Sequence, residues 1–476
     1  MPDSRNDHLY TARVILPNAR SAIERGAMRV RNGVIAAVGP RSDFGVRPDC
    51  AETDLGDVAL VPGLVNAHAH LAFTPCRGMF KRGPFVDWIF RAARAARTFT
   101  REQVAEGIVD GVRELARNGT TAVGDIVFDH LPLLSLEASG LRYACFYEVI
   151  NMTPPPYGGL LREIEERLAG FAPGPRAAVG LSPHTPYTVA RPLMAALRRR
   201  FQGPGRRVPF SIHVAECRSE IHCLARQAGR LADNLRRIGF YPPRPATAPL
   251  ARSVLDFLGA GEKSRGRFGR RGSADRRQPS RPRDILVHGN FLSDADVRAL
   301  AEADRSTLVI CPGTREFHGV HSSIFARVRR WGLPIALGTD SLASNTELNM
   351  WTEMRRALRM ARGWTAADVF DAATIGGARA LGLGGVVGEL RPGYRADFVA
   401  VALGPALVGP GLIGSDMTRS ASAGPTSRDV RAEQILAAWL SRDETPPVRN
   451  VWVEGEPILN RALYDRGIHR SCTKPR

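Results

Sequence analysis

Two histidines one residue apart, His68 and His70, end the apolar segment PGLVNAHAHLAF at residues 62–73. In a β-strand, residues i and i+2 point to the same side, so both imidazoles are expected on one face. Neutral imidazoles are common ligands of divalent transition metals. The pair alone is also compatible with exposed residues or hydrogen-bonded core residues. A metal site requires further His, Asp or Glu side chains from other parts of the chain.

Such side chains stand at the ends of four other apolar segments. They are His184 in SPHTPYT, His213 and Glu216 in SIHVAE, His288 in VHGN and Asp340 in LGTDS. Each has a structural explanation when taken alone, and Asp is a common helix N-cap. Local roles do not explain five separate strands that each end in a His or an Asp. Because the carboxyl ends of barrel strands form one active face, we expect these side chains to meet.

Three imidazoles and one carboxylate form a suitable ligand set for one divalent metal ion. The candidate ligands are His68, His70, His213 and Asp340. A water molecule at an open position of the metal would have its pKa lowered toward neutrality. The residue types therefore predict metal-assisted hydrolysis.

The remaining polar residues have expected roles in proton transfer and substrate binding. Glu216 lies three residues beyond His213 and could take a proton from the water and deliver it to a leaving group. His288 could polarise or hydrogen-bond the substituents of the electrophilic carbon. Asp340 could accept a proton from the attacking water as well as bind metal. His184 and Ser341 are candidate substrate contacts.

Eight apolar segments predict the strands that position these side chains. They lie at residues 58–67, 121–127, 142–150, 177–182, 208–214, 284–288, 307–311 and 334–338. Helical patterns between most of them, as at 101–119, 191–201 and 293–304, favour a parallel (β/α)8 TIM barrel of the α/β class. A doubly wound open sheet is the alternative.

Short β-like runs occur at both ends of the chain. Asn32-Gly33 between two of them is a strong hairpin signal. We therefore expect residues 1–57 and 388–476 to form one composite β-sandwich beside a barrel at 58–387. Within the second segment, residues 409–429 have the composition of a loop.

Composition is that of a globular protein, with 44% hydrophobic and 24% charged residues among 476. No uninterrupted apolar run of 18 residues occurs, so no membrane span is expected. The N-terminus lacks an apolar signal core, and the seven cysteines are scattered. Both observations favour a cytoplasmic protein without a disulfide framework.

The formal net charge of +19 raises the question of a nucleic-acid partner. Residues 261–283, GEKSRGRFGRRGSADRRQPSRPR, contain nine basic and two acidic residues, and their composition is typical of a mobile, solvated insertion. Phe268 is the one aromatic residue there, so no base-stacking platform is present. An RNA- or polyanion-binding role for this insertion is the alternative.

The segments PGLVNAHAH, SPHTPYTV, HVAE, VHGN and LGTDS follow one another over nearly the whole chain. Together they resemble the amidohydrolase superfamily, and more narrowly its cytosine/adenosine-deaminase-like, chlorohydrolase-like branch. The resemblance implies a metal-bearing barrel with a small β-sandwich from both termini, and one ion, usually Zn²⁺ and sometimes Fe²⁺. It implies the roles given above for the histidines and carboxylates, and it leaves open a homodimer.

The segment CRGMFKRGPFVDWIF at 76–90 resembles the loop that contacts the substrate in nucleoside-type members. Phe85 and Trp88 could wall or stack on the substrate, and Arg77 and Lys81 could meet an anionic group or a sugar. The alternative is a helix lead-in with Trp88 in packing.

The segment CPGTREFHG resembles aminodeoxyfutalosine deaminases and related adenosine-type deaminases, which typically show Ser-Asn or Ser-His after CPR. Here Gly313, Thr314 and Arg315 occupy those places. Arg315 either selects a carboxylate-bearing substrate or faces solvent.

We therefore expect a metal-dependent hydrolytic deaminase of an adenosine-like substrate, of the aminodeoxyfutalosine, methylthioadenosine or adenosylhomocysteine type. Water would attack the amino-bearing carbon, and ammonia would leave. The alternative is other amidohydrolase chemistry on a C–N or C–Cl bond, as in triazine chlorohydrolases and in guanine or cytosine deaminases. A non-catalytic polyanion-binding protein is a third hypothesis, against which the complete metal and proton-transfer set argues.

Overall fold

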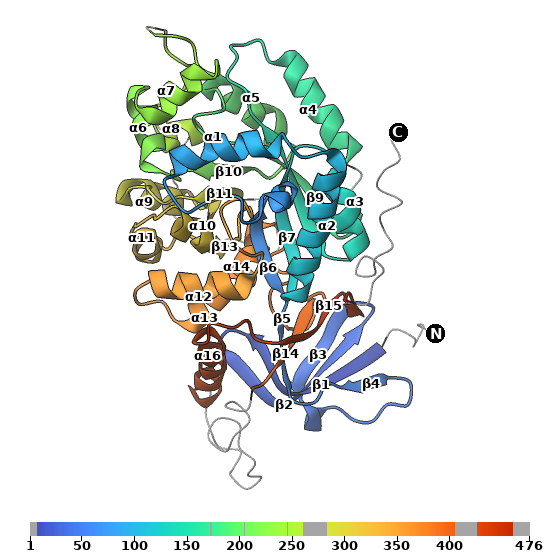
Figure 1. Cartoon of the computed structure of the whole chain (residues 1–476). Helices are drawn as coiled ribbons and strands as arrows, with labels where there is room; N and C mark the ends of the chain where they lie inside the picture. Colours follow the sequence, from blue (N-terminus) through green and yellow to red (C-terminus); the bar gives the residue numbers. More distant parts are fainter. Residues whose placement is uncertain are drawn as a thin grey trace.

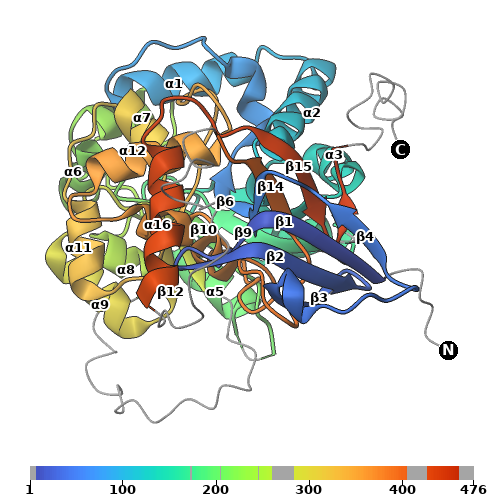
Figure 2. The ribbon, with the colours of Figure 1, turned by 90° about the horizontal axis from the view of Figure 1, so that it is seen from below.

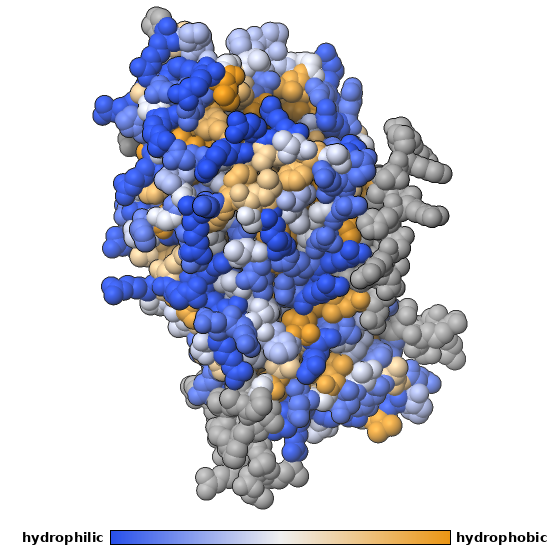
Figure 3. Space-filling model, viewed as in Figure 1, coloured by the Kyte–Doolittle hydropathy of each residue, from blue (hydrophilic) through white to orange (hydrophobic). Residues whose placement is uncertain are grey.

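The computed structural model describes residues 7–171, 174–203, 205–244, 246–259, 283–404 and 426–459, with side chains in the last segment from residue 431. Within these residues, two parallel β-sheets and many helices occupy one part of the molecule, and a third sheet lies below them (Figure 1). The face shown in Figure 3 is mostly hydrophilic, in keeping with the high content of charged residues.

The two parallel sheets contain the strands predicted for the barrel. One sheet has the order β6 (Leu64–Ala69), β7 (Thr120–Val127), β8 (Arg142–Val149), β9 (Ala177–Pro183). The other has the order β10 (Ser211–Val214), β11 (Asp284–His288), β12 (Ser306–Ile310), β13 (Ile335–Leu337). Most of their residues are buried, as expected for strands covered on both faces.

Isolated parallel bridges join the edges of the two sheets. Leu181 in β9 pairs with Phe210 beside β10, and Ala69 in β6 pairs with Asp340 beyond β13. One buried cluster also combines apolar side chains of both sheets with helix α14, for example Phe146, Val287 and Ala378. The eight strands are therefore arranged consistently with the predicted TIM barrel.

Helices connect and cover these strands. They are η3 (Leu71–Cys76), α1 (Phe85–Ala96), α2 (Arg101–Arg117), α3 (Leu131–Ser139), α4 (Gly158–Gly170), α5 (Arg191–Phe201), α6 (Arg218–Arg226), α7 (Arg230–Arg237), α8 (Val254–Leu258), α9 (Asp294–Ala303), α10 (Pro312–Phe317), α11 (Ile324–Trp331), α12 (Met350–Met360), α13 (Ala366–Ala372) and α14 (Ile375–Ala380). The three helices predicted from periodicity, now α2, α5 and α9, are confirmed. Capping boxes at Thr100 and Ser293 define where α2 and α9 begin.

The third sheet combines strands from both ends of the chain. Its order is β16 (Glu456–Pro457), β15 (Val448–Val453), β14 (Phe398–Ala402), β5 (Val58–Pro62), β1 (Asp7–Asn18), β2 (Ser21–Arg31), β3 (Val34–Pro40), with β4 (Ala51–Asp54) paired to β1 and the short helix η2 (Arg41–Asp43) after β3. The predicted hairpin is confirmed, because Asn32 and Gly33 join β2 to β3 with φ values of 50° and 73°. We call this sheet the terminal sheet; the composite sandwich remains a prediction.

Two sequence predictions are corrected here. The single strand expected at 58–67 is wrong, because β5 belongs to the terminal sheet and β6 to a parallel sheet. The break falls at Gly63, where a Cβ atom would stand 2.1 Å from Thr121 Oγ1, so the chain passes too close for a side chain. The loop expected at 409–429 ends early, because α16 (Thr426–Leu440) begins at Thr426 and contacts β2, α12 and α13 (Figure 2). The rest of that loop lies outside the described residues.

Other sequence expectations concern the surface and the thiols. Of the insertion at 261–283, only Arg283 is described, and its guanidinium pairs with Asp304 at 2.6 Å. The six cysteines in the described ranges are free thiols. None of the helices placed by the structure is both long and apolar enough to cross a membrane.

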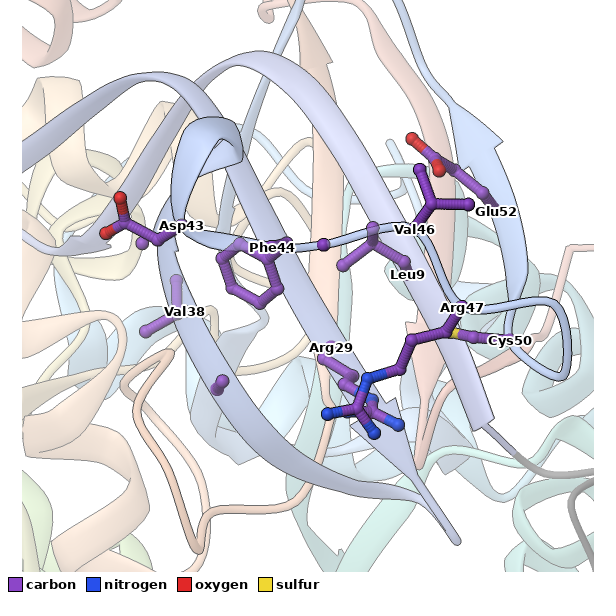
Figure 4. A pocket seen from close by; sticks show the side chains of 12 residues that line it. Leu9, Arg29, Val38, Asp43, Phe44, Val46, Arg47, Cys50 and Glu52 are labelled. Carbon is purple, nitrogen blue, oxygen red and sulfur yellow. The ribbon is translucent and has the colours of Figure 1, made fainter.

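A cavity of about 490 Å³ lies on the terminal sheet, under the segment that joins β3 to β4 (Figure 4). Phe44 and Val46 line one side, and Arg29 lies opposite them with its guanidinium paired to Asp7. This cavity contains none of the histidines on which the predicted chemistry depends.

Candidate active site

The carboxyl ends of strands from both parallel sheets bring the predicted catalytic side chains together. We call the resulting group the histidine–carboxylate cluster; it consists of His68, His70, His213, Glu216, His288 and Asp340. Within it, three sets of three ligand atoms each lie within 4.8 Å of one another, and every set shares residues with another set. The cluster is buried except for His70, which is partly buried, and its members come from β6, β10, β11 and the turns after β6, β10 and β13.

The nitrogen and oxygen atoms of the candidate metal ligands converge on one point. His68 Nε2 and His70 Nε2 lie 3.7 and 3.6 Å from Asp340 Oδ1, too far for good hydrogen bonds. His70 Nε2 lies 3.2 Å from His213 Nε2. His213 Nδ1 faces the carbonyl oxygen of His184 at 3.0 Å, so a proton on Nδ1 leaves Nε2 as a lone-pair donor toward the cluster.

Several buried nitrogen atoms of the cluster have no hydrogen-bond partner in the described residues. They bear on whether these residues could hold a metal ion. Both ring nitrogens of His68 and the Nδ1 atoms of His70 and His288 lack hydrogen bonds. Buried polar atoms without partners are rare in native proteins. Burial lowers the pKa of His70 and of His288 to about 3 and that of His213 well below its usual value. Neutral imidazoles are the form that binds metal, so the residues fit a divalent ion.

The backbone at the cluster is held in an uncommon conformation. His288 and Asp340 have φ values of 70° and 59°, and Ala215 before Glu216 has 50°. Left-handed conformations are rare for residues other than glycine and gather at functional sites. Amide groups of Thr339 and Asp340 both donate to the carbonyl oxygen of His68, which ties the end of β13 to β6.

Hydrogen bonds hold the Asp340 carboxylate in place. Ser341 N donates to Oδ1 at 2.8 Å, Thr314 Oγ1 donates to Oδ2 at 2.9 Å, and Ser344 Oγ lies 3.4 Å from Oδ2. Burial opposes ionisation, but the nearby imidazoles of His68, His288 and His70 hold the pKa of Asp340 well below its usual value. The carboxylate is therefore ionised and oriented.

The surroundings of Glu216 favour the protonated carboxyl group, unlike those of Asp340. Burial raises the pKa of Glu216 well above its usual range, and the charges of Asp340 and Glu220 raise it further. Its Oε1 atom lies 3.5 Å from His288 Nε2. Two carboxyl groups with pKa values pushed apart suit complementary acid and base roles.

Sequence reasoning missed two residues that hold the Glu216 backbone. Glu220 accepts hydrogen bonds from the amides of Ala215 and Glu216 at 2.8 and 2.9 Å, and Asn290 Nδ2 donates to the carbonyl oxygen of Glu216 at 3.0 Å. Burial raises the pKa of Glu220 to about 7. The spacing of Glu220, four residues beyond Glu216, was the available signal.

A cavity of about 470 Å³ opens beside the cluster. Of the predicted substrate contacts, His184, Trp88, Phe85 and Ser341 line it. Trp88 Nε1 donates to the carbonyl oxygen of Ala343 at 2.9 Å, so Trp88 offers its ring rather than a hydrogen bond.

The structure does not bring Arg77, Lys81 or Arg315 to this cavity. Arg77 forms an ion pair with Glu114 and donates to the carbonyl oxygen of Thr346, and Lys81 is exposed. Arg315 is buried, so the solvent-facing alternative is wrong.

Arg315 is instead held by protein groups. Its guanidinium donates to Asn290 Oδ1 at 3.0 Å and to the carbonyl oxygen of Ser322 at 3.2 Å, and it lies over the Phe325 ring. Asn290 Nδ2 donates to the carbonyl oxygen of Glu216, so Arg315 helps to position Glu216 through Asn290.

Several residues that line the cavity were not predicted, among them Glu148, Arg97, Phe128 and Ile150. Glu148 interrupts an otherwise apolar strand end in FYEVIN, and that was its only sequence signal. Phe128 and Ile150 are large apolar residues that remain partly exposed at the cavity.

The fold and the cluster can now be compared with known proteins. A model of the amidohydrolase family matches residues 59–458, and this chain belongs to that family. A 5-methylthioadenosine/S-adenosylhomocysteine deaminase from Syntrophobacter fumaroxidans is 29% identical over 431 residues, which are 84% of this chain and 86% of that protein.

Two further relatives have related activities in their names. An aminodeoxyfutalosine deaminase from Deinococcus radiodurans is 30% identical over 392 residues, covering 79% of this chain and 85% of that protein. The crystal structure of an adenosine deaminase from Xanthomonas campestris with bound zinc superposes with a TM-score of 0.70 and 25% identity, covering 95% of this chain and 92% of that chain.

Proposed function

We propose that this chain is a metal-dependent hydrolytic deaminase of an adenosine-like nucleoside, and that its eight parallel strands close one (β/α)8 barrel. The observation that carries the proposal is the histidine–carboxylate cluster, where three buried imidazoles and an ionised Asp340 lie beside a proton-holding Glu216. Relatives named as deaminases over most of the chain support the same reaction class.

The metal would be held by His68, His70, His213 and Asp340. Nitrogen-rich sets with one carboxylate are typical of Zn²⁺, and the related adenosine deaminase contains zinc; Fe²⁺ is the alternative. When bound, the ion supplies a Lewis acid that lowers the pKa of water.

The chain's own groups would then move the protons. Glu216 holds a proton at its carboxyl group and can give it to the ring nitrogen next to the amino-bearing carbon. His288 Nε2, 3.5 Å from Glu216 Oε1, can hydrogen-bond the water oxygen as it attacks that carbon. Asp340 can accept one proton from the water and return it to the amino group, so that ammonia leaves. The remaining hydroxyl proton can then pass to Glu216 as the C=O bond forms, which restores the protonated carboxyl group.

The cavity suits a flat heterocycle with an apolar substituent. The rings of Phe85 and Trp88 stand near the cluster, and Phe73, Phe128 and Ile150 continue the apolar lining. Apolar surface buried against such walls contributes about 25 cal/mol per Å². This supports substrates of the methylthioadenosine type, in which the sugar carries an apolar group.

Ammonia release by the zinc-loaded protein tests the proposal. The panel contains adenosine, methylthioadenosine, adenosylhomocysteine, aminodeoxyfutalosine, guanine and cytosine, with Glu216→Gln as the control variant. We expect release from an adenosine-type nucleoside by the wild-type protein and none above background by the variant. A folded, metal-loaded protein that is inert toward all the nucleosides would refute the proposal.

A further inference from the structure

Glu148 is a buried carboxyl group that the proposed reaction does not use. It lies near the carboxyl end of β8, it lines the cavity, and its side chain is only 4% exposed. Among the described residues, no hydrogen bond is made by its carboxyl oxygens. The neighbouring polar atom, His184 Nε2, lies 3.9 Å from Oε1, which is too far for a hydrogen bond.

Such an arrangement is costly for the free protein. A carboxyl group with little exposure to water and no protein partner loses much of its hydration without a compensating hydrogen bond. In keeping with this, burial raises the pKa of Glu148 to about 8. His184 also keeps Nε2 free, because its Nδ1 atom is bonded to Thr188 Oγ1 at 2.9 Å. Two unbonded polar groups therefore face the same part of the cavity.

The position of Glu148 indicates which part of a nucleoside it would meet. β8 is paired with β9, and His184 follows β9 with its ring 5.2 Å from the ring of His213. Glu148 is thus separated from the candidate metal ligands by one side chain. When the amino-bearing carbon of a purine lies at the cluster, the sugar is attached to the other ring of the base, on the side away from the cluster.

The cavity wall formed by α1 offers the sugar little hydrogen bonding. Along α1 the cavity is lined by small or apolar residues such as Ile89, Ala93 and Ala96. Arg97 follows them at the exposed end of the helix, roughly 14 Å from Trp88 at 1.5 Å per residue. The α1 residues that line the cavity before Arg97 have no side-chain acceptor, whereas Glu148 near the end of β8 has two carboxyl oxygens.

We propose that Glu148 is a specificity-determining residue that hydrogen-bonds the 2′- and 3′-hydroxyl groups of the nucleoside ribose. A vicinal diol presents two O–H donors, and one carboxylate presents two oxygens that can accept them, so binding of the diol favours the ionised form of Glu148. Acidic side chains bind ribose hydroxyls in this way in dinucleotide-binding folds. This inference rests on the proposed function, because it assumes a nucleoside in the cavity.

The test compares sugars rather than bases. The substrates are 5′-methylthioadenosine and its 2′-deoxy and 3′-deoxy forms, and the variants are Glu148→Ala, Glu148→Gln and Glu148→Asp. We expect the wild-type protein to prefer the ribonucleoside about 10- to 100-fold in kcat/KM, the range that corresponds to one hydrogen bond to a charged group. Glu148→Ala should abolish this preference mainly through KM, and Glu148→Asp should restore part of it.

Asp125→Asn is the control, because Asp125 is a buried carboxyl on the adjacent strand that does not line the cavity. Its ratio of ribo to deoxy activity should equal that of the wild type. Equal losses on ribo and deoxy substrates in Glu148→Ala would overturn the inference. So would an effect confined to adenosylhomocysteine, because Glu148 would then bind the ammonium group of the amino-acid tail.

Calorimetric binding of adenosine and 2′-deoxyadenosine to Glu216→Gln separates this inference from the deaminase proposal, because binding needs no turnover. If ribose is preferred only when Glu148 is present, but the wild-type protein releases no ammonia, the inference about Glu148 is supported and the deaminase proposal is refuted. If ammonia is released without any ribose preference, the deaminase proposal is supported and the inference about Glu148 is refuted. Absence of both binding and release would overturn both.

Discussion

Thr314 provides a direct test of the proposal that Asp340 binds metal. Its hydroxyl group donates to Asp340 Oδ2 at 2.9 Å, and both residues are buried. Thr314→Val keeps the shape of the side chain and removes this donor. Because the donor stabilises the ionised carboxylate, we expect the variant to bind Zn²⁺ more weakly.

The size of the effect follows from the hydrogen bond. A bond to a charged group contributes about 1.5–3 kcal/mol, and each 1.4 kcal/mol corresponds to about tenfold in affinity. This gives a loss of about 10- to 100-fold, the range found for groups that orient metal ligands. Ser344 Oγ lies 3.4 Å from the same oxygen and can compensate in part, so we expect about tenfold for Thr314→Val and a larger loss when Ser344→Ala is added.

Competition with a chromophoric chelator measures the zinc affinity, and ammonia release at limiting zinc should fall in parallel. Thr307→Val is the matched control, because Thr307 is fully buried on β12 and its hydroxyl group has no partner among the described residues. It should bind zinc as the wild type does. Unchanged affinity in Thr314→Val, or an equal loss in Thr307→Val, would refute the role given to this hydrogen bond.

Three other perturbations have defined outcomes. Removal of metal with a chelator should abolish ammonia release and added Zn²⁺ should restore it, whereas Glu216→Gln should bind one equivalent of zinc and still lose at least about 10²-fold in kcat, as removal of a general acid–base predicts. Arg142→Met leaves the Asp397 carboxylate buried without its partner at 2.6 Å, so urea unfolding should show a loss of about 3–5 kcal/mol that Arg142→Met/Asp397→Leu largely recovers. Burial raises the pKa of Asp125 to about 8, so between about pH 4 and pH 8 the native state keeps a proton that the unfolded state has lost. The free energy of unfolding should therefore fall as pH rises through this range and then level off. In Asp125→Asn this fall should be smaller; an identical pH profile in the variant would contradict the assignment.

The cluster residues could be predicted because each follows a readable apolar strand. The spacing of His68 and His70 indicated a metal-binding pair. The position of His213, His288 and Asp340 at strand ends indicated that they belong to the same site. Local patterns also predicted the Asn32-Gly33 hairpin and the helices α2, α5 and α9, since their signals lie within a few residues. Strand 58–67 was misread because an apolar run does not show that the chain changes sheets at Gly63.

Side-chain contacts across the fold could not be predicted in this way. Arg315 looked like a substrate contact from its motif, yet it lies buried against Asn290 and Ser322, and Arg77 is engaged by Glu114. Glu148 gave almost no sequence signal, because one Glu in a strand does not reveal whether it faces solvent, a partner or a cavity.

The sequence by itself determined which atoms are available for the chemistry: imidazoles and carboxylates at the ends of strands that must be buried. Only the tertiary structure decided which of them meet, because their separation in space depends on strand order and register, which bring β6 beside the end of β13. It also decided their protonation, since burial and neighbouring charges push the pKa of Glu216 up and that of Asp340 down. Those shifts come from the surroundings that folding creates, and no local pattern encodes them.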